Sequence, residues 1–498
     1  MFTSISIPTQ QRILSLEAVF VLVGAIAVAG FILMPEAGLV VVGGCLALWF
    51  LTLLGEAVRG RIDGILLVWA AALPLIPYFL SFPREHSIVT LDRVAILFAF
   101  LGLYFAKRSA LVEVPRKLRQ AGLAWLGFIA VAGVTLGKSP AVLNTAHELL
   151  DGFLLPLFLG WSVIARFDVR RRLPTLHTAV CISSIICAAV AAAEIVTVQD
   201  LLPNGDSVMF YAGGIPRPNG PFSSNDVLAL MGAVSFFFLL FLRAALGPNL
   251  STGRRILHSI GLAAALGMAL MPMFRSVVIT LLLALIIDTF WEQRTSRRVW
   301  RVVLMLASIG VIFIVPLFAP KVFEDRSSSE NAYGRIAEFE QSLRVFVDHP
   351  LLGVGFQNFN NYVGGEPRYV ASYAGVSSLD TPHNTLAEIL TETGIVGFVP
   401  YVMAHVLLLM AMWQLRQLSR SGYLVWKYYV YLFLSYWITG LTESSGYGYL
   451  NLWYAFAVAV SCKYALTEPD LIPPAEVAVP DEAFSAPARI SSWPLFLR

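Results

Sequence analysis

Charged residues are scarce in this chain of 498 residues. They make up 13% of it, about half the share of an ordinary soluble domain. Apolar types make up 57%, and they lie in runs longer than a soluble core helix needs. This composition excludes a soluble enzyme and an extended nucleic-acid groove. It predicts an all-α polytopic membrane protein.

Cysteine is also rare, and none of it lies in a polar loop. No CxxC motif, Cys/His cluster, DxD motif or His-rich helix is found in the sequence. We therefore expect four inert thiols, neither a disulfide framework nor a zinc site, no catalytic metal and no cofactor. The four are Cys45, Cys181, Cys187 and Cys462.

The apolar runs set the expected number of spans. A helix needs roughly 20 apolar residues to cross the hydrocarbon layer, which predicts about 12–14 transmembrane helices. The first run, 13–34, is long enough to stay in the bilayer and has no small-residue cleavage site, so we do not expect a signal peptide. The candidate spans are 13–34, 37–54, 64–82, 91–106, 120–136, 148–165, 175–197, 226–242, 256–272, 276–291, 302–319, 385–414, 428–440 and 447–465.

Basic residues are distributed unevenly between the two sides of these spans. With the N-terminus in the cytoplasm, 25 of the 35 Lys and Arg residues lie inside and 10 outside. Because positive charge is retained on the cytoplasmic side, this predicts that both termini are cytoplasmic.

One long polar segment interrupts the spans on the outer side. It contains a 3-4-3 apolar spacing over Ile336, Phe339, Leu343 and Phe346, which predicts an amphipathic helix. The tail after about 467 is rich in Pro, Ala and acidic residues and is predicted to be disordered. The resulting division is 1–197 and 198–320 (membrane helices), 321–384 (large outer loop), 385–466 (membrane helices) and 467–498 (cytoplasmic tail).

Two arginines lie in constrained outer positions. Arg217 stands between Pro216 and Pro218, which fix the backbone around it. Arg275 joins two apolar runs with almost no polar linker, so its guanidinium lies at the outer interface. Each has a simpler interpretation, as a solvated loop residue for Arg217 and as a side chain snorkelling to lipid phosphates for Arg275.

A histidine lies where the large loop meets the next span. Pro382 suits a first helical position, with Thr381 or Asp380 as the N-cap, which predicts that His383 lies in the first helical turn. The positive helix end disfavours imidazolium, so the ring is expected to be neutral and able to accept a proton. The simpler interpretation is a hydrogen-bonded His at a helix start.

Together these three residues suit a diphosphate and a hydroxyl. Guanidinium groups bind phosphate oxygens bidentately, and His is suited to general-base work near neutral pH. The two arginines would stabilise a leaving diphosphate without Mg²⁺.

Three motifs resemble the O-antigen ligase/polymerase family of bacterial membrane glycosyltransferases. They are RPNGPFSSN at 217–225, the helix from Arg335 followed by HPLLGVGFQNF at 349–359, and HNTLAE…ETGIVG at 383–397. The resemblance covers roughly residues 210 to 440.

The resemblance implies a GT-C-like bundle in the bacterial inner membrane with one large periplasmic loop. It also implies transfer of a glycan from undecaprenyl diphosphate to an acceptor hydroxyl on the periplasmic face, in lipopolysaccharide or exopolysaccharide synthesis. It assigns His383 as the base and Arg217 and Arg275 as the diphosphate-binding residues. Possible supporting residues are Arg335, Asn384 and Glu388.

The acceptor is left open by the sequence. A lipid A-core sugar would make the protein a ligase, a second lipid-linked repeat unit a polymerase, and a protein Ser/Thr an O-oligosaccharyltransferase. An alternative from another class is a lipid-linked oligosaccharide transporter or flippase, which would need polar residues at mid-membrane and paired repeats.

Overall fold

The computed structural model describes most of the chain between residues 50 and 467. The predicted span 13–34, most of the predicted spans 37–54 and 302–319, Cys45, Asp380 and the tail beyond Thr467 lie outside the described residues. The described residues are 44, 47, 50–75, 81–82, 89–105, 114–199, 209–210, 216–291, 299, 302, 329–378, 381–443 and 448–467.

Helices dominate this described part, as predicted. Strands occur there as three two-residue antiparallel pairs: β1 (Ser81–Phe82) with β2 (Val89–Thr90), β3 (Met209–Phe210) with β4 (Pro216–Arg217), and β5 (Ser372–Tyr373) with β6 (Val376–Ser377). The α-helices are α3 (Ile62–Ala72), α5 (Leu91–Phe105), α6 (Arg116–Thr135), α7 (Val142–Leu149), α8 (Leu155–Arg166), α9 (Val169–Thr197), α10 (Asn225–Ala245), α11 (Thr252–Leu270), α12 (Arg275–Trp291), α15 (Ser329–Asp348), α16 (Phe359–Gly364), α17 (Thr385–Leu418), α18 (Arg420–Gly440) and α19 (Gly448–Thr467).

Five helical segments among the described residues are long and apolar enough to cross a membrane, so the chain is a multi-pass membrane protein. They are Arg116–Lys138, Val142–Arg166, Val169–Thr197, Asn225–Ala245 and Thr385–Gln417. The second combines α7 and α8 through a π-helical turn, Leu150–Leu154. The predicted span 64–82 is wrong at its end, because α3 stops at Ala72 and Pro74 lies in a 3-10 turn.

The bundle core is built from aromatic side chains on helices distant in sequence. Trp69 of α3 packs against Trp453 and Phe456 of α19, with ring centroids 5.9 and 5.2 Å apart. Both buried indoles keep a polar partner: Trp69 donates to Asp92, and Trp453 donates to Ser235 Oγ over 3.0 Å. Buried indole N–H groups need such partners, so these bonds fix the register between the helices.

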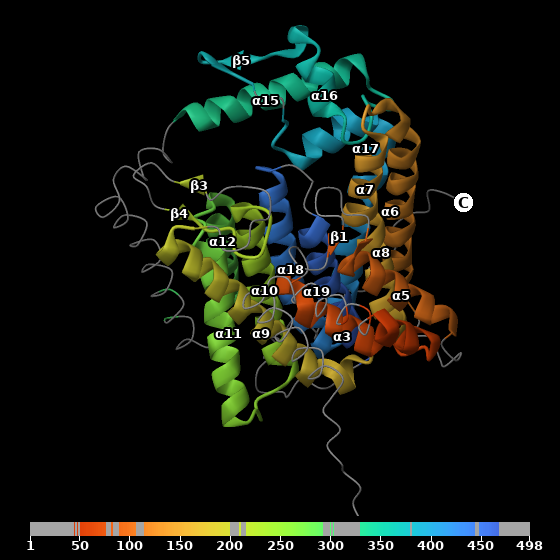
Figure 1. Ribbon diagram of the computed structural model, residues 1–498, viewed down its shortest axis with the longest axis vertical. Coiled ribbons are helices and arrows are strands. Elements are labelled where there is room, and N and C mark those ends of the chain that lie inside the picture. The colour runs from red at the N-terminus through yellow and green to blue at the C-terminus, as the bar shows by residue number, and fades with distance from the viewer. Residues whose placement is uncertain are drawn as a thin grey trace, which may run out of the picture.

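The large outer loop is folded, and we call its described part, residues 329–378, the cap. Figure 1 shows α15 lying across one end of the bundle, with α16 and β5 on the same side. The cap has a small core of its own, formed by Val345, Val354, Phe359, Val363 and Tyr369.

The predicted amphipathic helix exists as α15, but its buried face is not the predicted one. Ile336, Phe339 and Leu343 are 42–48% exposed, whereas Glu338 and Gln341 are buried. The apolar spacing correctly indicated a helix with an apolar stripe. The side of α15 that faces inward is set instead by its packing against α17 and by the ion pairs of its charged residues.

Candidate functional site

The cap is fastened to α17 through a break in that helix. Gly394 has φ 61° and ψ −170°, which interrupts the helical hydrogen bonding. The freed backbone groups pair with the segment after α15: the amides of Val354 and Gly355 donate to the carbonyls of Thr391 and Glu392, both over 2.9 Å. Two motifs that lie 35 residues or so apart in sequence are thereby joined into one unit.

Glycine is required on both sides of this joint. A Cβ on Gly394 would lie 2.2 Å from the carbonyl oxygen of Leu351, and one on Gly353 would lie 2.3 Å from that of Thr391. Both glycines also have φ near +60°, where other residues are strained. The joint therefore explains the glycines of the second and third motifs.

Two carboxylates of α17 hold the cap from below. Glu392 accepts the amide of Gln357 over 2.8 Å and that of Phe359 over 3.3 Å. Glu388, predicted as a supporting residue, accepts Gln357 Nε2 over 3.2 Å. Glu388 thus lies in the joint between cap and helix.

His383 lies outside the helix, so its predicted place in the first turn is wrong. The N-cap of α17 is Asn384, whose Oδ1 accepts the amides of Leu386 and Ala387 over 3.0 and 3.1 Å. The side chain next to the helix therefore supplies the cap, and Thr381 does not; the other predicted cap, Asp380, lies outside the described residues. His383 precedes Asn384 with φ 42°, a left-handed conformation that is strained for a residue other than glycine.

A carboxylate that the sequence did not single out faces this histidine. Oε2 of Glu443, in the segment after α18, lies 3.5 Å from Nδ1 of His383. Oε1 of Glu443 lies 3.7 Å from a guanidinium nitrogen of Arg335. The Glu443 carbonyl accepts Thr385 Oγ1 over 3.0 Å, so the backbone that carries the carboxylate is fastened to the start of α17.

A second carboxylate extends this network into the cap. Glu338 is buried and lies 3.4 Å from Arg335. Burial raises the pKa of Glu338 to about 7; Arg335 lowers it and Glu443 raises it further. The sequence suggested no acidic group here, because the partners come from separate segments: α15, the residue before α17, and the residues after α18.

Arg275 begins α12 beside the same network. Its neighbour Ser276 shares a hydrogen bond of 2.5 Å between hydroxyl oxygens with Thr442, which precedes Glu443. Met273, two residues before Arg275, has φ 49°. The structure therefore brings the start of α12, which carries Arg275, and His383 to one segment, residues 441–443.

Arg217 lies at the same end of the bundle, in a loop that is held by other contacts. It lies on β4, and the amides of Asn219 and Gly220 donate to Oε2 of Glu194 over 2.9 and 2.7 Å. Glu194 lies in the last turn of α9, and α10 begins shortly after these residues. The connections from α10 to α11 and from α11 to α12 are short, so consecutive helices run in opposite directions. The starts of α10 and α12 therefore lie at the same end of the bundle.

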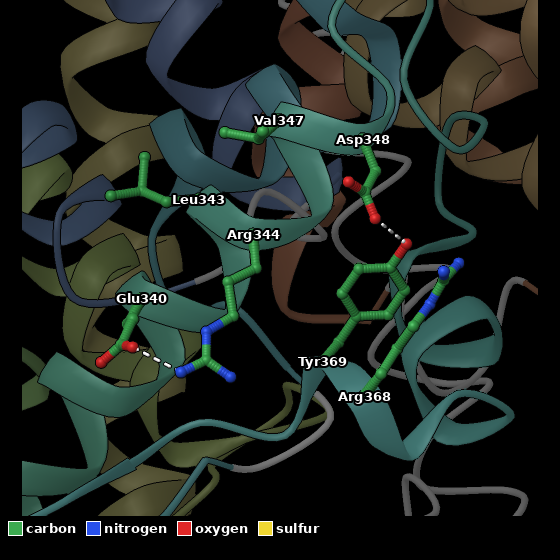
Figure 2. A pocket seen from close by; sticks show the side chains of 7 residues that line it. All are labelled: Glu340, Leu343, Arg344, Val347, Asp348, Arg368 and Tyr369. Carbon is green, nitrogen blue, oxygen red and sulfur yellow. Dashed lines mark hydrogen bonds and ion pairs between the residues drawn. The ribbon is translucent and has the colours of Figure 1, made fainter.

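The cap carries an open cavity of about 380 Å³ between α15 and the segment at Arg368 and Tyr369 (Figure 2). Tyr369 donates to Asp348 over 2.8 Å, and Arg344 donates to Glu340 over 2.6 Å. The Arg368 guanidinium lies 4.7 Å from the Tyr369 ring centroid. The cavity offers an aromatic face, donors and acceptors, and sequence reasoning missed it because its parts come from α15 and from the 3-10 turn Pro367–Tyr369.

Far from this end, the fold also brings two histidines and a cysteine together. His177, Cys181 and His258 are buried, and their ligand atoms lie within 4.8 Å of one another. The expectation that the chain has no Cys/His cluster is therefore wrong: no such cluster exists along the sequence, but α9 and α11 create one by packing.

Residues 260–402 match the O-antigen ligase family model. This segment includes Arg275, the cap and His383, whereas Arg217 and Glu443 lie outside it. No curated protein matches the chain. The chain is thus a multi-pass membrane protein in which residues 260–402 are similar to the O-antigen ligase family.

Proposed function

We propose that this protein transfers a glycan from undecaprenyl diphosphate to an acceptor hydroxyl at the cap end of the bundle. The observation that supports the proposal most is the meeting of His383, Glu443 and the Arg275-bearing helix start at residues 441–443. In this proposal the cap end faces the periplasm, both termini are cytoplasmic and the membrane is the bacterial inner membrane, in agreement with the charge asymmetry.

His383 is the general base of the proposed reaction. Its Nε2 takes the proton of the acceptor hydroxyl while that oxygen forms a bond to the anomeric carbon. The bond between this carbon and the diphosphate oxygen breaks, and the diphosphate leaves with the electron pair. Glu443 lies on the Nδ1 side, where a carboxylate orients the ring and stabilises the imidazolium that forms.

Arg275 and Arg217 bind the donor diphosphate. The prenyl chain stays in the bilayer, so the charge that develops on the leaving group lies at the interface, where these arginines begin or precede helices. Guanidinium groups fixed in a site of low water content stabilise such charge strongly. The transition state resembles an oxocarbenium ion, so positioning and charge neutralisation supply the catalysis, without a catalytic metal ion.

Arg335 and the cap act on the acceptor side. Arg335 faces Glu443 and Glu338, and in this proposal it holds Glu443 against His383. The product of the reaction distinguishes three acceptors. A lipid A-core sugar would make the enzyme a ligase, a lipid-linked repeat unit a polymerase, and a protein hydroxyl an oligosaccharyltransferase.

The proposal is tested with purified protein, a diphospho-undecaprenyl glycan and candidate acceptors. His383→Ala is expected to lower the transfer rate by about 10² to 10⁴, the usual contribution of a general base. The matched control is His147→Ala in α7, which lies outside the network. EDTA is expected to leave the rate unchanged.

Either of two results would contradict the proposal. If His383→Ala transferred the glycan at the wild-type rate, His383 would not be the general base. If EDTA abolished activity and Mg²⁺ restored it, the reaction would need a metal ion. Movement of an intact lipid-linked glycan across vesicles, with no glycosidic bond formed, would favour the flippase instead.

A further inference from the structure

The two histidines and the cysteine between α9 and α11 form a compact set of ligand atoms. His177 and Cys181 are one helical turn apart on α9, and Nε2 of His177 lies 3.8 Å from the Cys181 Sγ. Nδ1 of His258, from the second turn of α11, lies 3.2 Å from the same Nε2. The three side chains are at least nine-tenths buried.

These distances match the spacing of ligands around one metal ion. With metal–nitrogen bonds of about 2.0 Å and metal–sulfur bonds of about 2.3 Å, tetrahedral or trigonal ligands lie roughly 3.3–3.7 Å apart. The distances of 3.2 and 3.8 Å therefore require shifts of only a few tenths of an ångström. The third pair, Nδ1 of His258 and Sγ of Cys181, lies within 4.8 Å and would have to approach by no more than about 1 Å.

The surrounding structure leaves room for the thiol and leaves one ring nitrogen unsatisfied. A Cβ on Gly261 of α11 would lie 2.8 Å from the Cys181 Sγ, so glycine there lets the sulfur approach the other helix. Nδ1 of His177 is buried, and it has no hydrogen-bond partner among the described residues. Nδ1 would carry the proton when Nε2 binds a metal, since a neutral imidazole carries one proton.

The charge of the surroundings favours a monovalent ion. Arg243 lies in the last turn of α10 and Arg254 in the first turn of α11, one turn before His258, so a complex with net positive charge is disfavoured in this buried place. A cuprous ion with one thiolate and two neutral imidazoles is neutral, whereas a zinc ion with the same ligands carries one positive charge. Thiolate and imidazole ligands suit Cu(I).

We propose that His177, Cys181 and His258 bind one cuprous ion that ties α9 to α11. Binding releases the thiol proton of Cys181 and replaces the hydrogen bond between the two histidines with two metal–nitrogen bonds. The site is structural and separate from glycan transfer. His177 and Glu194 are 17 positions apart on α9, or about 25 Å along the helix axis, so the cluster lies far from the Glu194 end.

The test uses the full chain, purified in detergent under anaerobic conditions and titrated with Cu(I) against a chromophoric chelator. The wild type is expected to take up a single ion, and X-ray absorption is expected to show one sulfur and two nitrogen neighbours. Cys181→Ala and His258→Gln are expected to lose this uptake. The matched control is Cys187→Ala, which removes another buried thiol of α9 and is expected to retain it.

A second measurement guards against variants that fold poorly. Cu(I) is expected to raise the melting temperature of the wild type and of Cys187→Ala, because a ligand that binds only the folded state stabilises it. No uptake and no thermal shift in the wild type would overturn the proposal and leave a simple His–His hydrogen bond. Uptake that survives in Cys181→Ala, or binding of Zn(II) in preference to Cu(I), would overturn it as well.

Discussion

His383 and His177 lie at opposite ends of the bundle, and their surroundings differ in every respect. The His383 side chain is 27% exposed, lies outside regular helix and faces a carboxylate. His177 is fully buried, lies within α9 and faces a thiol and a second imidazole. The first arrangement is suited to proton transfer at an interface, and the second to a hydrogen bond or a metal ion.

The backbone differs between the two ends in the same way. Near the cap, His383, Met273 and Gln357 all have positive φ, and α17 is broken at Gly394. Strained conformations of this kind persist where the surroundings over-determine them, and they are concentrated at functional sites. The cluster between α9 and α11 needs no such strain, because regular helix spacing already places His177 and Cys181 on one face.

The largest effect is expected from filling the joint under the cap. Gly394→Ala combines the cost of a φ/ψ region that is open almost only to glycine with a clash against Leu351, roughly 3 kcal/mol or more. The control is Gly375→Ala, whose φ is also positive but whose Cβ meets nothing within 4 Å, so about 1 kcal/mol is expected. Thermal unfolding in detergent measures both; equal shifts would show that the joint is not tightly packed.

The role of Arg275 is tested by comparing two replacements. Arg275→Ala is expected to lower kcat/KM for the lipid-linked donor by about 10². Arg275→Lys should recover only part of that loss, because an ammonium group cannot bind phosphate oxygens bidentately. Arg420→Ala, at the opposite end of the bundle, is the control. Full recovery by lysine would indicate that charge alone matters there.

Glu443→Gln should weaken the His383 site without abolishing it. The amide keeps the shape but cannot stabilise an imidazolium, so kcat is expected to fall by about 10 to 100. The donor KM is expected to remain near the wild-type value. A loss confined to KM, with kcat intact, would assign Glu443 to substrate binding instead of to His383.

The smallest effect concerns the pH dependence of stability. Glu338 has a pKa of about 7 in the folded protein, against an ordinary value of 4.5. Because the folded state holds this proton more tightly than the unfolded state, its contribution to stability is present below about pH 4.5 and is lost as the pH rises through 7. Glu338→Gln should therefore reduce the loss of unfolding free energy between pH 5 and 8 by about 1–2 kcal/mol, which is measured as a smaller fall in melting temperature over that range. If the melting temperature of Glu338→Gln depended on pH as that of the wild type does, the buried Glu338 carboxyl would not be the cause of the pH dependence.

Sequence reasoning predicted part of the fold around the candidate site. The periodicity of the large loop predicted α15, and the joint at Gly394 shows why the motifs need their glycines. It did not find Glu443, because an isolated acid in a short connection carries no pattern. It also misplaced the start of α17, because Thr381 or Asp380 was predicted as the cap, whereas the fold uses Asn384.

The linear order of residues determined the membrane character, most of the helices and the types of residue available for chemistry, because hydropathy and helix period are local properties. Only the tertiary structure decided which polar groups meet: Glu443 with His383 and Arg335, and His258 with His177 and Cys181. These pairs lie 60 to 108 or so positions apart, and nothing local fixes a contact at that separation. These contacts are set by the packing of the helices and by the backbone hydrogen bonds that join the cap to the bundle.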